Sequence, residues 1–561
     1  MEEVPTESGS AGRRFVAAVV LLGTIATVLG LLCIRIEPFD DGALLMGARM
    51  TRAGALPYVD FYTLYGPFGY TLLGWLLGVV RSPPLAPRLG HAALFSAVAL
   101  LAWVLDRRTA GSGDRGWAFL LFLVALSATA PLASFFAFAL AVSALLCFAM
   151  GEASARPASA GWTAACGALL ALTALTRPAF TLYVGAGLLL GALVDGTSRM
   201  RRLAIVGAVA LVGFALVWLS AYSRLPWRTA LEASLLAPGR LAMSGARSRL
   251  APFLEAPPVV AFAWGASFVA AILSWAIAAR TRGGRFLAAL SVLLGGLAAL
   301  WLRRSAAPGR EAAALAGGLL VLSGAIAYCE RAALRESPRL RAAVLFGLTA
   351  AAFSHYFWSR QDRAHVLPLV ALAAAGAALA IDRVRVPMRL VAVALLVLMF
   401  APATVDALPV ASLLDGGLAS IARSARRTGA TLSTVWPCTE VPADAARAVA
   451  LADRGAAPTS RFVAVASSQA QSVINPVILF LLSRRLPYTK WYTYDPGVQD
   501  SAAVQAEMSR DLGDSGSATA VVWRAPGAQR TAFDTEFDRL YPVTVARFGD
   551  YEVRGSVAAA R

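Results

Sequence analysis

Two adjacent carboxylates, Asp40 and Asp41, follow directly on an apolar run of the sequence. Neighbouring carboxylates raise each other's pKa, and such a pair can act as a general base or bind a divalent metal. A carboxylate can also cap a helix, and the Ala, Leu, Met and Arg residues that follow are typical of one. Capping accounts for one of the two. The pair is therefore a candidate catalytic site and a candidate place for a metal, although no His stands nearby to support a metal ligand.

A cluster of aromatic residues follows the acidic pair and encloses one further carboxylate, Asp60. Aromatic rings at this density form the belt that anchors membrane proteins at the bilayer surface. They could equally stack against sugar rings or a lipid headgroup. On that second interpretation Tyr58, Asp60 and Tyr65 are candidate residues for binding the sugar or phosphate of a donor.

A second polar cluster occupies the segment SHYFWSRQDRAHVLPL, residues 354–369. Arginine pairs bind phosphate bidentately, and a neighbouring Asp and His could orient a group or exchange a proton. A solvated turn between two apolar segments is the alternative, although such a turn does not need this density of charge. The candidate phosphate-binding residues are Arg360, Asp362, Arg363 and His365.

The composition indicates that these clusters are positioned by membrane-spanning helices. Hydrophobic residues make up 58% of the 561 residues and charged residues only 15%, with a mean hydropathy of +0.64. A soluble domain carries about 25% charged residues, so a soluble multidomain enzyme is excluded. The net charge of +18 is almost entirely Arg, spread through short loops between apolar runs. That distribution orients a membrane protein, and we expect no nucleic-acid partner.

Apolar runs long enough to cross a bilayer predict thirteen transmembrane helices within residues 15–405. A further run at 66–80 is too short, and we expect it to be re-entrant or to lie at the outer surface. Arg is then roughly twice as dense in the loops on the side of residues 1–14, so the positive-inside rule places the N-terminus in the cytoplasm. The predicted spans are 15–34, 88–105, 116–130, 133–150, 160–176, 179–194, 202–222, 257–279, 285–302, 312–330, 341–358, 364–382 and 387–405.

Residues 406–561 have a different pattern, with more charge and shorter apolar runs. Alternation in RFVAVAS, TAVVWRA and PVTVARFGDYEVR predicts strands, and two helix-like stretches lie between the first two of these segments. The order strand–helix–helix–strand indicates a small α/β domain. With an odd number of spans, this domain lies outside the cytoplasm, and a binding or scaffolding role is expected of it.

The first outer loop resembles a known family. An acidic pair after a first span, then ARMTRAGALPYVDF and YGPFGY, is similar to the corresponding loop of C-type membrane glycosyltransferases (GT-C fold). The similarity is to the bacterial branch allied to protein mannosyltransferases (glycosyltransferase family 39-like) and the lipid A aminoarabinose transferase. RQDRAH resembles an R-x-D-x-x-H turn in bacterial members, and the tail with INPVILFLLSRRLPYTKW resembles theirs.

The resemblance implies transfer of a sugar from a polyprenyl-phosphate donor to a glycan, lipid or protein acceptor, at the outer face of a bacterial inner membrane. The acidic residue that acts on the acceptor hydroxyl maps onto Asp40 or Asp41. The branch usually has Asp-Glu where this chain has Asp-Asp, so which carboxylate is the base stays open, with Asp40 slightly favoured. The alternatives are a lipid-linked sugar transporter or flippase, which would need charges near the bilayer midplane, and a non-catalytic assembly protein.

Overall fold

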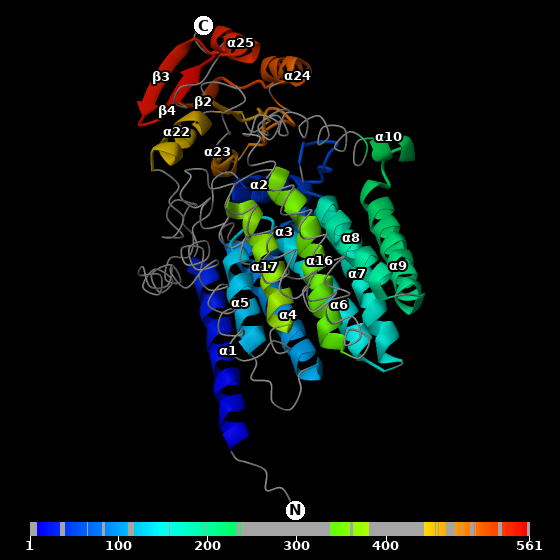
Figure 1. The fold of residues 1–561 in the computed structure, drawn as a ribbon. Coiled ribbons are helices and arrows are strands. Elements are labelled where there is room, and N and C mark those ends of the chain that lie inside the picture. Colours follow the sequence, from blue (N-terminus) through cyan, green and yellow to red (C-terminus); the bar gives the residue numbers. More distant parts are fainter. Residues whose placement is uncertain are drawn as a thin grey trace, which may run out of the picture. The chain divides into compact units, whose positions relative to one another are not determined.

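The computed structural model of the chain describes most of its helices and the sheet near its C-terminus (Figure 1). The described residues are 8–33, 40–63, 65–80, 85–109, 117–155, 157–195, 197–232, 236, 337–359, 363–380, 443–454, 456–457, 459–466, 477–483, 485–493, 499, 501–524 and 530–557.

The chain divides into two compact units, each built from segments far apart in the sequence. The first unit consists of Met1–Leu32, His91–Val217 and Ala251–Asp415, and the second of Cys33–Gly90, Trp218–Leu250 and Gly416–Arg561. The acidic pair and the C-terminal sheet therefore belong to one unit.

The first unit is helical, and α16 packs against α17 and α8, α6 against α7, and α17 against α5 (Figure 1). Four described helices, α4, α6, α7 and α9, are long and apolar enough to cross a membrane, so the protein is a helical membrane protein. The helices are α1 (Ser8–Cys33), α4 (Leu85–Thr109), α5 (Trp117–Thr129), α6 (Phe135–Ala153), α7 (Ala158–Thr176), α8 (Pro178–Asp195), α9 (Thr197–Tyr222), α16 (Pro338–Ser359) and α17 (Arg363–Ala380). The start of α4, up to Gly90, and the end of α9, from Trp218, belong to the second unit.

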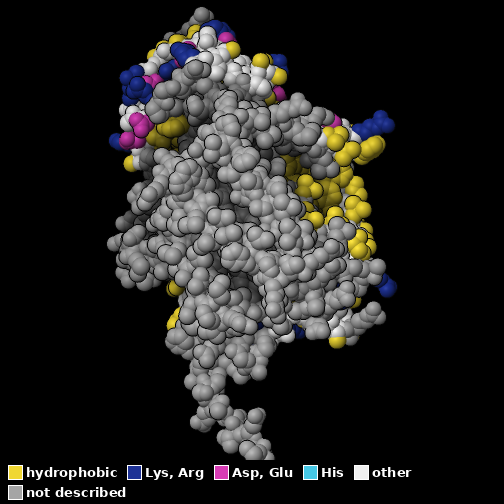
Figure 2. All heavy atoms as spheres, in the orientation of Figure 1, with side chains coloured by type: hydrophobic (Ala, Val, Ile, Leu, Met, Phe, Trp, Pro, Cys, Tyr) yellow, Lys and Arg dark blue, Asp and Glu magenta, His cyan; other side chains and the backbone are white. Residues whose placement is uncertain are grey.

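Two of these helices show opposite patterns of burial. The most apolar stretch of α6 is 94% buried, whereas that of α9 is only 6% buried. Figure 2 shows the exposed apolar side chains gathered along α9, among them Leu211, Leu216 and Leu219. A helix that exposes large aliphatic side chains over its length is stable against lipid and not against water.

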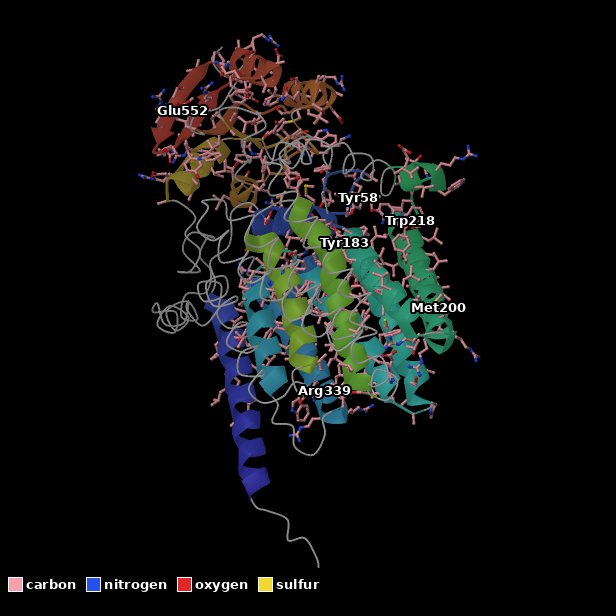
Figure 3. The ribbon with its side chains drawn as sticks, in the orientation of Figure 1. Tyr58, Tyr183, Met200, Trp218, Arg339 and Glu552 are labelled. Atoms are coloured by element: carbon pink, nitrogen blue, oxygen red, sulfur yellow. The ribbon has the colours of Figure 1, made fainter. Side chains whose placement is uncertain are left out.

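Buried ion pairs join the ends of four helices of the first unit. Glu152, at the end of α6, accepts hydrogen bonds from Arg199 of α9, one of them 2.7 Å long, and lies 3.7 Å from Arg341 of α16. Asp106, at the end of α4, lies 3.5 Å from Arg339 of α16 (Figure 3). The end of α6 and the starts of α9 and α16 therefore lie at the same end of this bundle.

The described helices match the predicted spans in the part of the chain that can be compared. Each of the nine predicted spans within the described residues coincides with a helix, and the short run at 66–80 forms α3 (Pro67–Val80). The predicted spans 257–279, 285–302, 312–330 and 387–405 lie outside the described residues, so the number thirteen stays a prediction.

The second unit contains a four-stranded sheet of order β1-β2-β4-β3, in which β1 is parallel to β2 and the other pairs are antiparallel. The strands are β1 (Val463–Ala466), β2 (Thr519–Trp523), β3 (Val543–Phe548) and β4 (Tyr551–Gly555). They lie within the three segments whose alternation predicts strands. Its helices are α2 (Asp40–Arg52), α3, α10 (Trp227–Leu231), α22 (Ala443–Asp453), α23 (Ile478–Leu482), α24 (Ala502–Gly513) and α25 (Ala532–Leu540).

A two-residue turn joins β3 to β4 and needs glycine at its first position. Gly549 has φ +55°, and Phe548 and Tyr551 are paired on either side of the turn. A positive φ there suits a primed hairpin turn, whose twist matches that of the strands. A Cβ on Gly549 would also meet the carboxylate of Asp444 in α22, which packs against β3 and β4.

Candidate functional site

The acidic pair forms the first turn of α2, and the structure gives its two members different surroundings. Asp40 is exposed, whereas Asp41 is only 2% exposed. Successive residues of a helix point about 100° apart, so one can face solvent while the next is buried. Both carboxylates complement the positive end of the helix dipole, and Arg49 and Arg52 complement the other end.

Arg88, in the first turn of α4, donates a hydrogen bond through Nη2 to Oδ2 of Asp41. Both side chains are 2% exposed. Separating two buried charges would leave each without a partner, which costs much free energy. The pair therefore fixes the direction of the Asp41 side chain. Asp41 is thus engaged by an arginine, and Asp40 is the carboxylate that faces solvent.

Close packing against α3 fixes the position of α2. The ring of Tyr70 lies over Gly47, where a Cβ would be 2.8 Å from its Cδ1 atom and closer still to Cε1. A Cβ on Gly74 would be 3.1 Å from the backbone oxygen of Ala48. Tyr70 is itself buried and shares a hydrogen bond with Thr63. Helices can approach this closely only where glycine replaces a larger residue.

The loop after α2 uses Asp60 to close on itself. The backbone N–H of Leu56 donates to Asp60 Oδ2 at 2.7 Å, and the N–H of Asp60 donates to the Leu56 oxygen at 2.9 Å. Tyr58, between them, has φ +67° and is the only non-glycine residue with positive φ among the described residues (Figure 3). A bulky residue in that region costs of order 1–3 kcal/mol, and such strain clusters at binding sites.

The aromatic residues that follow the acidic pair differ in how far they are buried. Phe61, Tyr62 and Tyr70 are buried, and Phe61 meets Tyr70 edge-on with the ring centroids 5.4 Å apart. Tyr58 and Tyr65 are part-exposed, and Tyr65 lies edge-on to Tyr70 at 6.4 Å. Phe68 is part-exposed as well, so three described rings of this cluster reach the surface, and the assignment of Tyr58 and Tyr65 to donor binding stays a prediction.

The second polar cluster falls mostly outside the described part of the chain. Arg360 and Asp362 are not among the described residues, and Arg363 and His365 form the first turn of α17 without a described side chain. The assignment of these four residues to the donor phosphate stays a prediction.

Metal binding at the acidic pair gains no support from the residues that the structure describes. Among them, no group of three or more His, Cys, Asp and Glu side chains is placed to hold a metal ion. The neighbour of Asp41 is instead the guanidinium of Arg88. We therefore derive no step through a metal.

The sequence interpretation did not single out Arg88 or Gly47 as residues of this site. Arg88 lies three residues inside an apolar helix, where a charged side chain needs a partner. The acidic pair, Asp40 and Asp41, offers the nearest preceding carboxylates that the sequence places at the end of a span. That signal could have suggested the pair. The contact of Gly47 with Tyr70 has no comparable signal, because a lone glycine in a helix has several explanations.

Comparison with known proteins gives similarity at the level of structure. No protein-family model and no curated protein sequence matches the chain. Among solved structures, the chain is similar to ArnT from Cupriavidus metallidurans in the apo state, with 14% identity and a TM-score of 0.47, over 98% of this chain and 99% of that chain. It is also similar to the archaeal oligosaccharyltransferase AglB from Archaeoglobus fulgidus, solved in complex with an inhibitory peptide and a dolichol-phosphate. That match has 12% identity and a TM-score of 0.46, over 91% of this chain and 69% of that chain.

At these identities and TM-scores, the reaction has to be argued from the residues of the site.

Proposed function

We propose that the chain is a membrane glycosyltransferase that moves a sugar from a polyprenyl-phosphate donor to an acceptor at the outer face of the membrane. The observation that carries this proposal is the division of the acidic pair: Asp41 is buried and bound to Arg88, while Asp40 stays exposed on the same rigid turn. The pair then has two roles, with Asp41 holding the turn in place and Asp40 acting on the acceptor.

The proposed reaction is a single displacement with inversion. The acceptor hydroxyl attacks the anomeric carbon of the donor, and its proton passes to the Asp40 carboxylate. The bond between the anomeric carbon and the phosphate oxygen breaks, and polyprenyl phosphate leaves with the electron pair. A positioned carboxylate base contributes about 10²–10⁴-fold to such a reaction. Arginines would stabilise the phosphate as it leaves, and Arg360 and Arg363 are the proposed residues for this role.

The placement of charges along α4 supports an outer-face site. Arg88 pairs with Asp41 in the first turn of α4, and Asp106 pairs with Arg339 in the last. From residue 88 to residue 106 a helix rises about 27 Å, close to the thickness of the hydrocarbon core. In the proposed orientation Asp106 lies at the cytoplasmic end of α4, so Arg88, at the other end of the same helix, lies at the outer surface.

The distribution of charge in the spanning helices favours a transferase over a transporter. In α4, α6, α7 and α9, every Asp, Glu and Arg lies in the first or last six residues. Transporters place charged residues and broken helices near the bilayer midplane, where they bind the substrate. Charges at helix ends suit a protein that holds a lipid chain among its helices and does chemistry at the surface.

The test uses the full chain in proteoliposomes with a panel of synthetic polyprenyl-phosphate sugars, and it measures release of free polyprenyl phosphate. Asp40→Asn should lower turnover by about 10²–10⁴-fold, because an amide cannot take a proton. Asn keeps the shape and hydrogen-bonding oxygen of Asp and loses only the favourable interaction of the charge with the helix dipole, so stability should fall by no more than about 1 kcal/mol. Glu536→Gln, an exposed acid on α25 paired with Arg539, is the control and should leave turnover unchanged. Full turnover in Asp40→Asn would overturn the proposed function.

A further inference from the structure

The helix that carries the acidic pair is held by a segment from the other end of the chain. We call residues 478–492 the α23 segment; it comprises α23 and the extended residues after it, and residue 484 lies outside the described residues. Its contacts with α2 and with the loop after α2 join residues more than 400 positions apart in sequence.

The first contact is between the last turn of α2 and the end of α23. Nη1 of Arg49 donates to the backbone oxygen of Ser483 at 2.6 Å and to that of Phe480 at 3.4 Å. The last carbonyls of a helix lack partners within it, and a cation there also interacts favourably with the helix dipole. Burial lowers the pKa of Arg49, and the carboxylate of Asp453 opposes this shift. The guanidinium still donates its hydrogen bonds to these two carbonyl oxygens.

The second contact is at the first turns of α2. The hydroxyl of Tyr492 donates to the backbone oxygen of Ala43 at 3.4 Å, three residues after Asp40. The ring of Tyr492 is buried, with its centroid 6.3 Å from that of the Phe61 ring and 5.9 Å from that of the Phe480 ring. This side chain therefore touches both α2 and the loop that follows it.

The third contact fixes that loop directly. The backbone N–H of Tyr62 donates to the oxygen of Lys490 at 2.9 Å, and the ring of Tyr62 lies 5.2 Å from that of Trp491. The α23 segment is in turn bound to α24 and β1. Trp491 Nε1 and Lys490 Nζ both donate to Glu507 of α24, and the N–H of Phe462 donates to the oxygen of Leu486 at 2.8 Å.

From these contacts we propose that the α23 segment positions the acidic pair for the reaction, with Tyr492 and Arg49 as its positioning residues. The proposal rests on the proposed function and gives a specific form to the binding or scaffolding role expected of the C-terminal region. The segment connects a rigid sheet to both ends of α2, while Arg88 and Tyr70 restrain α2 on other sides. A helix held at so many points carries Asp40 with little freedom, and a displacement of about 1 Å at a reacting group can cost 10²-fold in rate.

The test separates positioning from simple stability with matched tyrosines. Tyr492→Phe removes only the hydroxyl that binds Ala43. Tyr541→Phe removes a buried hydroxyl of the same unit that donates to the Ser517 oxygen at 3.0 Å and shares a hydrogen bond with the Ser515 hydroxyl at 3.3 Å, with no bond to α2 among the described residues. Both should lower the melting temperature by similar small amounts. Only Tyr492→Phe should speed hydrogen exchange in residues 40–52, and it should lower kcat by about three- to tenfold with the donor KM unchanged.

Arg49→Met extends the test to the other end of α2, with an expected fall in kcat of about 10- to 100-fold, and Arg49→Lys should restore part of it. In an Asp40→Asn background, Tyr492→Phe should have no further effect on turnover, because the carboxylate it positions is gone. Equal hydrogen exchange of α2 in the two tyrosine variants would overturn the positioning role. So would an unchanged kcat in Tyr492→Phe while Asp40→Asn is inactive. Full turnover in Asp40→Asn would instead count against the proposed function itself.

Discussion

Arg88 donates a hydrogen bond to the carboxylate of Asp41, and this buried ion pair joins the first turn of α4 to the first turn of α2. A carboxylate bound in this way is poorly placed to take a proton from a substrate. The structure therefore gives different surroundings to two residues between which the sequence only slightly favours Asp40. On the proposed function, Asp41 and Arg88 hold the turn in place and Asp40, the exposed member of the pair, acts as the base.

The first prediction concerns this pair. Arg88→Met should destabilise the protein by about 3–5 kcal/mol, because it leaves the Asp41 charge buried without its partner. Replacing both residues, as Asp41→Asn with Arg88→Met, should recover much of that loss, since no lone charge remains. Thermal unfolding in detergent of the two single variants and the double variant measures the coupling. Additive losses would show that the two side chains do not interact.

The second prediction concerns the contact between α2 and α3. Gly47→Ala should cost about 1–3 kcal/mol, because the new methyl group overlaps the Tyr70 ring and the Thr63 bond keeps that ring from moving away. Gly513→Ala in α24 is the matched control. A Cβ there meets no atom within 4 Å, so its effect should be neutral or slightly stabilising. The two melting temperatures compared with wild type decide the matter, and equal shifts would contradict the close packing.

The third prediction is a pH dependence of the contact between the α23 segment and α24. Burial raises the pKa of Glu507, but hydrogen bonds from Lys490 and Trp491 outweigh it and leave the pKa below its usual value. A carboxylate with a lowered pKa in the folded state stabilises the fold above its unfolded pKa, about 4.3 for Glu, and this stabilisation is lost as the pH falls through the folded pKa. Glu507→Gln should therefore melt at a lower temperature at pH 7 and lose less on acidification. A melting temperature that falls with pH as steeply as in wild type would rule out this contribution.

The fourth prediction is the orientation in the membrane. A reporter that is active only outside the cytoplasm should be active when it is fused after Arg561, and inactive when it is inserted near residue 112, in the segment between α4 and α5. The reason is that Arg-rich loops stay in the cytoplasm, and the Asp106 and Glu152 pairs mark that end of the bundle. A cytoplasm-only reporter that is active after Arg561 would reverse the orientation.

Periodicity and segment length were enough to locate the long apolar helices and the strands among the described residues. The apolar runs give the described spanning helices to within a few residues, and the alternation of RFVAVAS and TAVVWRA gives β1 and β2. Two short helices, α22 and α25, are absent from the sequence interpretation. Thr531 and Asp534 form a capping box at the start of α25, and that T-x-x-D pattern was a usable signal.

The candidate site was only partly predictable, because its contacts are not local. The acidic pair and the part-exposed Tyr58 and Tyr65 follow from residue type and spacing. The closing of the loop by Asp60 and the contact of Tyr492 with Ala43 depend on how distant segments pack. No pattern within a short window of sequence contains that information. Packing of one side chain against another decides it, and Tyr492 gives no sign in its own segment of the helix that it will touch.

The contact between Ala43 and Tyr492 also sets an order of events during synthesis. The two residues are 449 positions apart. At about 5–20 residues per second, a ribosome needs roughly 20–90 s to add the second after the first. During that interval α2 has been synthesised, but the α23 segment that contacts it has not. If the proposed function and the positioning role hold, a nascent chain should stay inactive until residue 492 has been added, and a stop codon before that residue should yield a chain that inserts in the membrane and transfers no sugar.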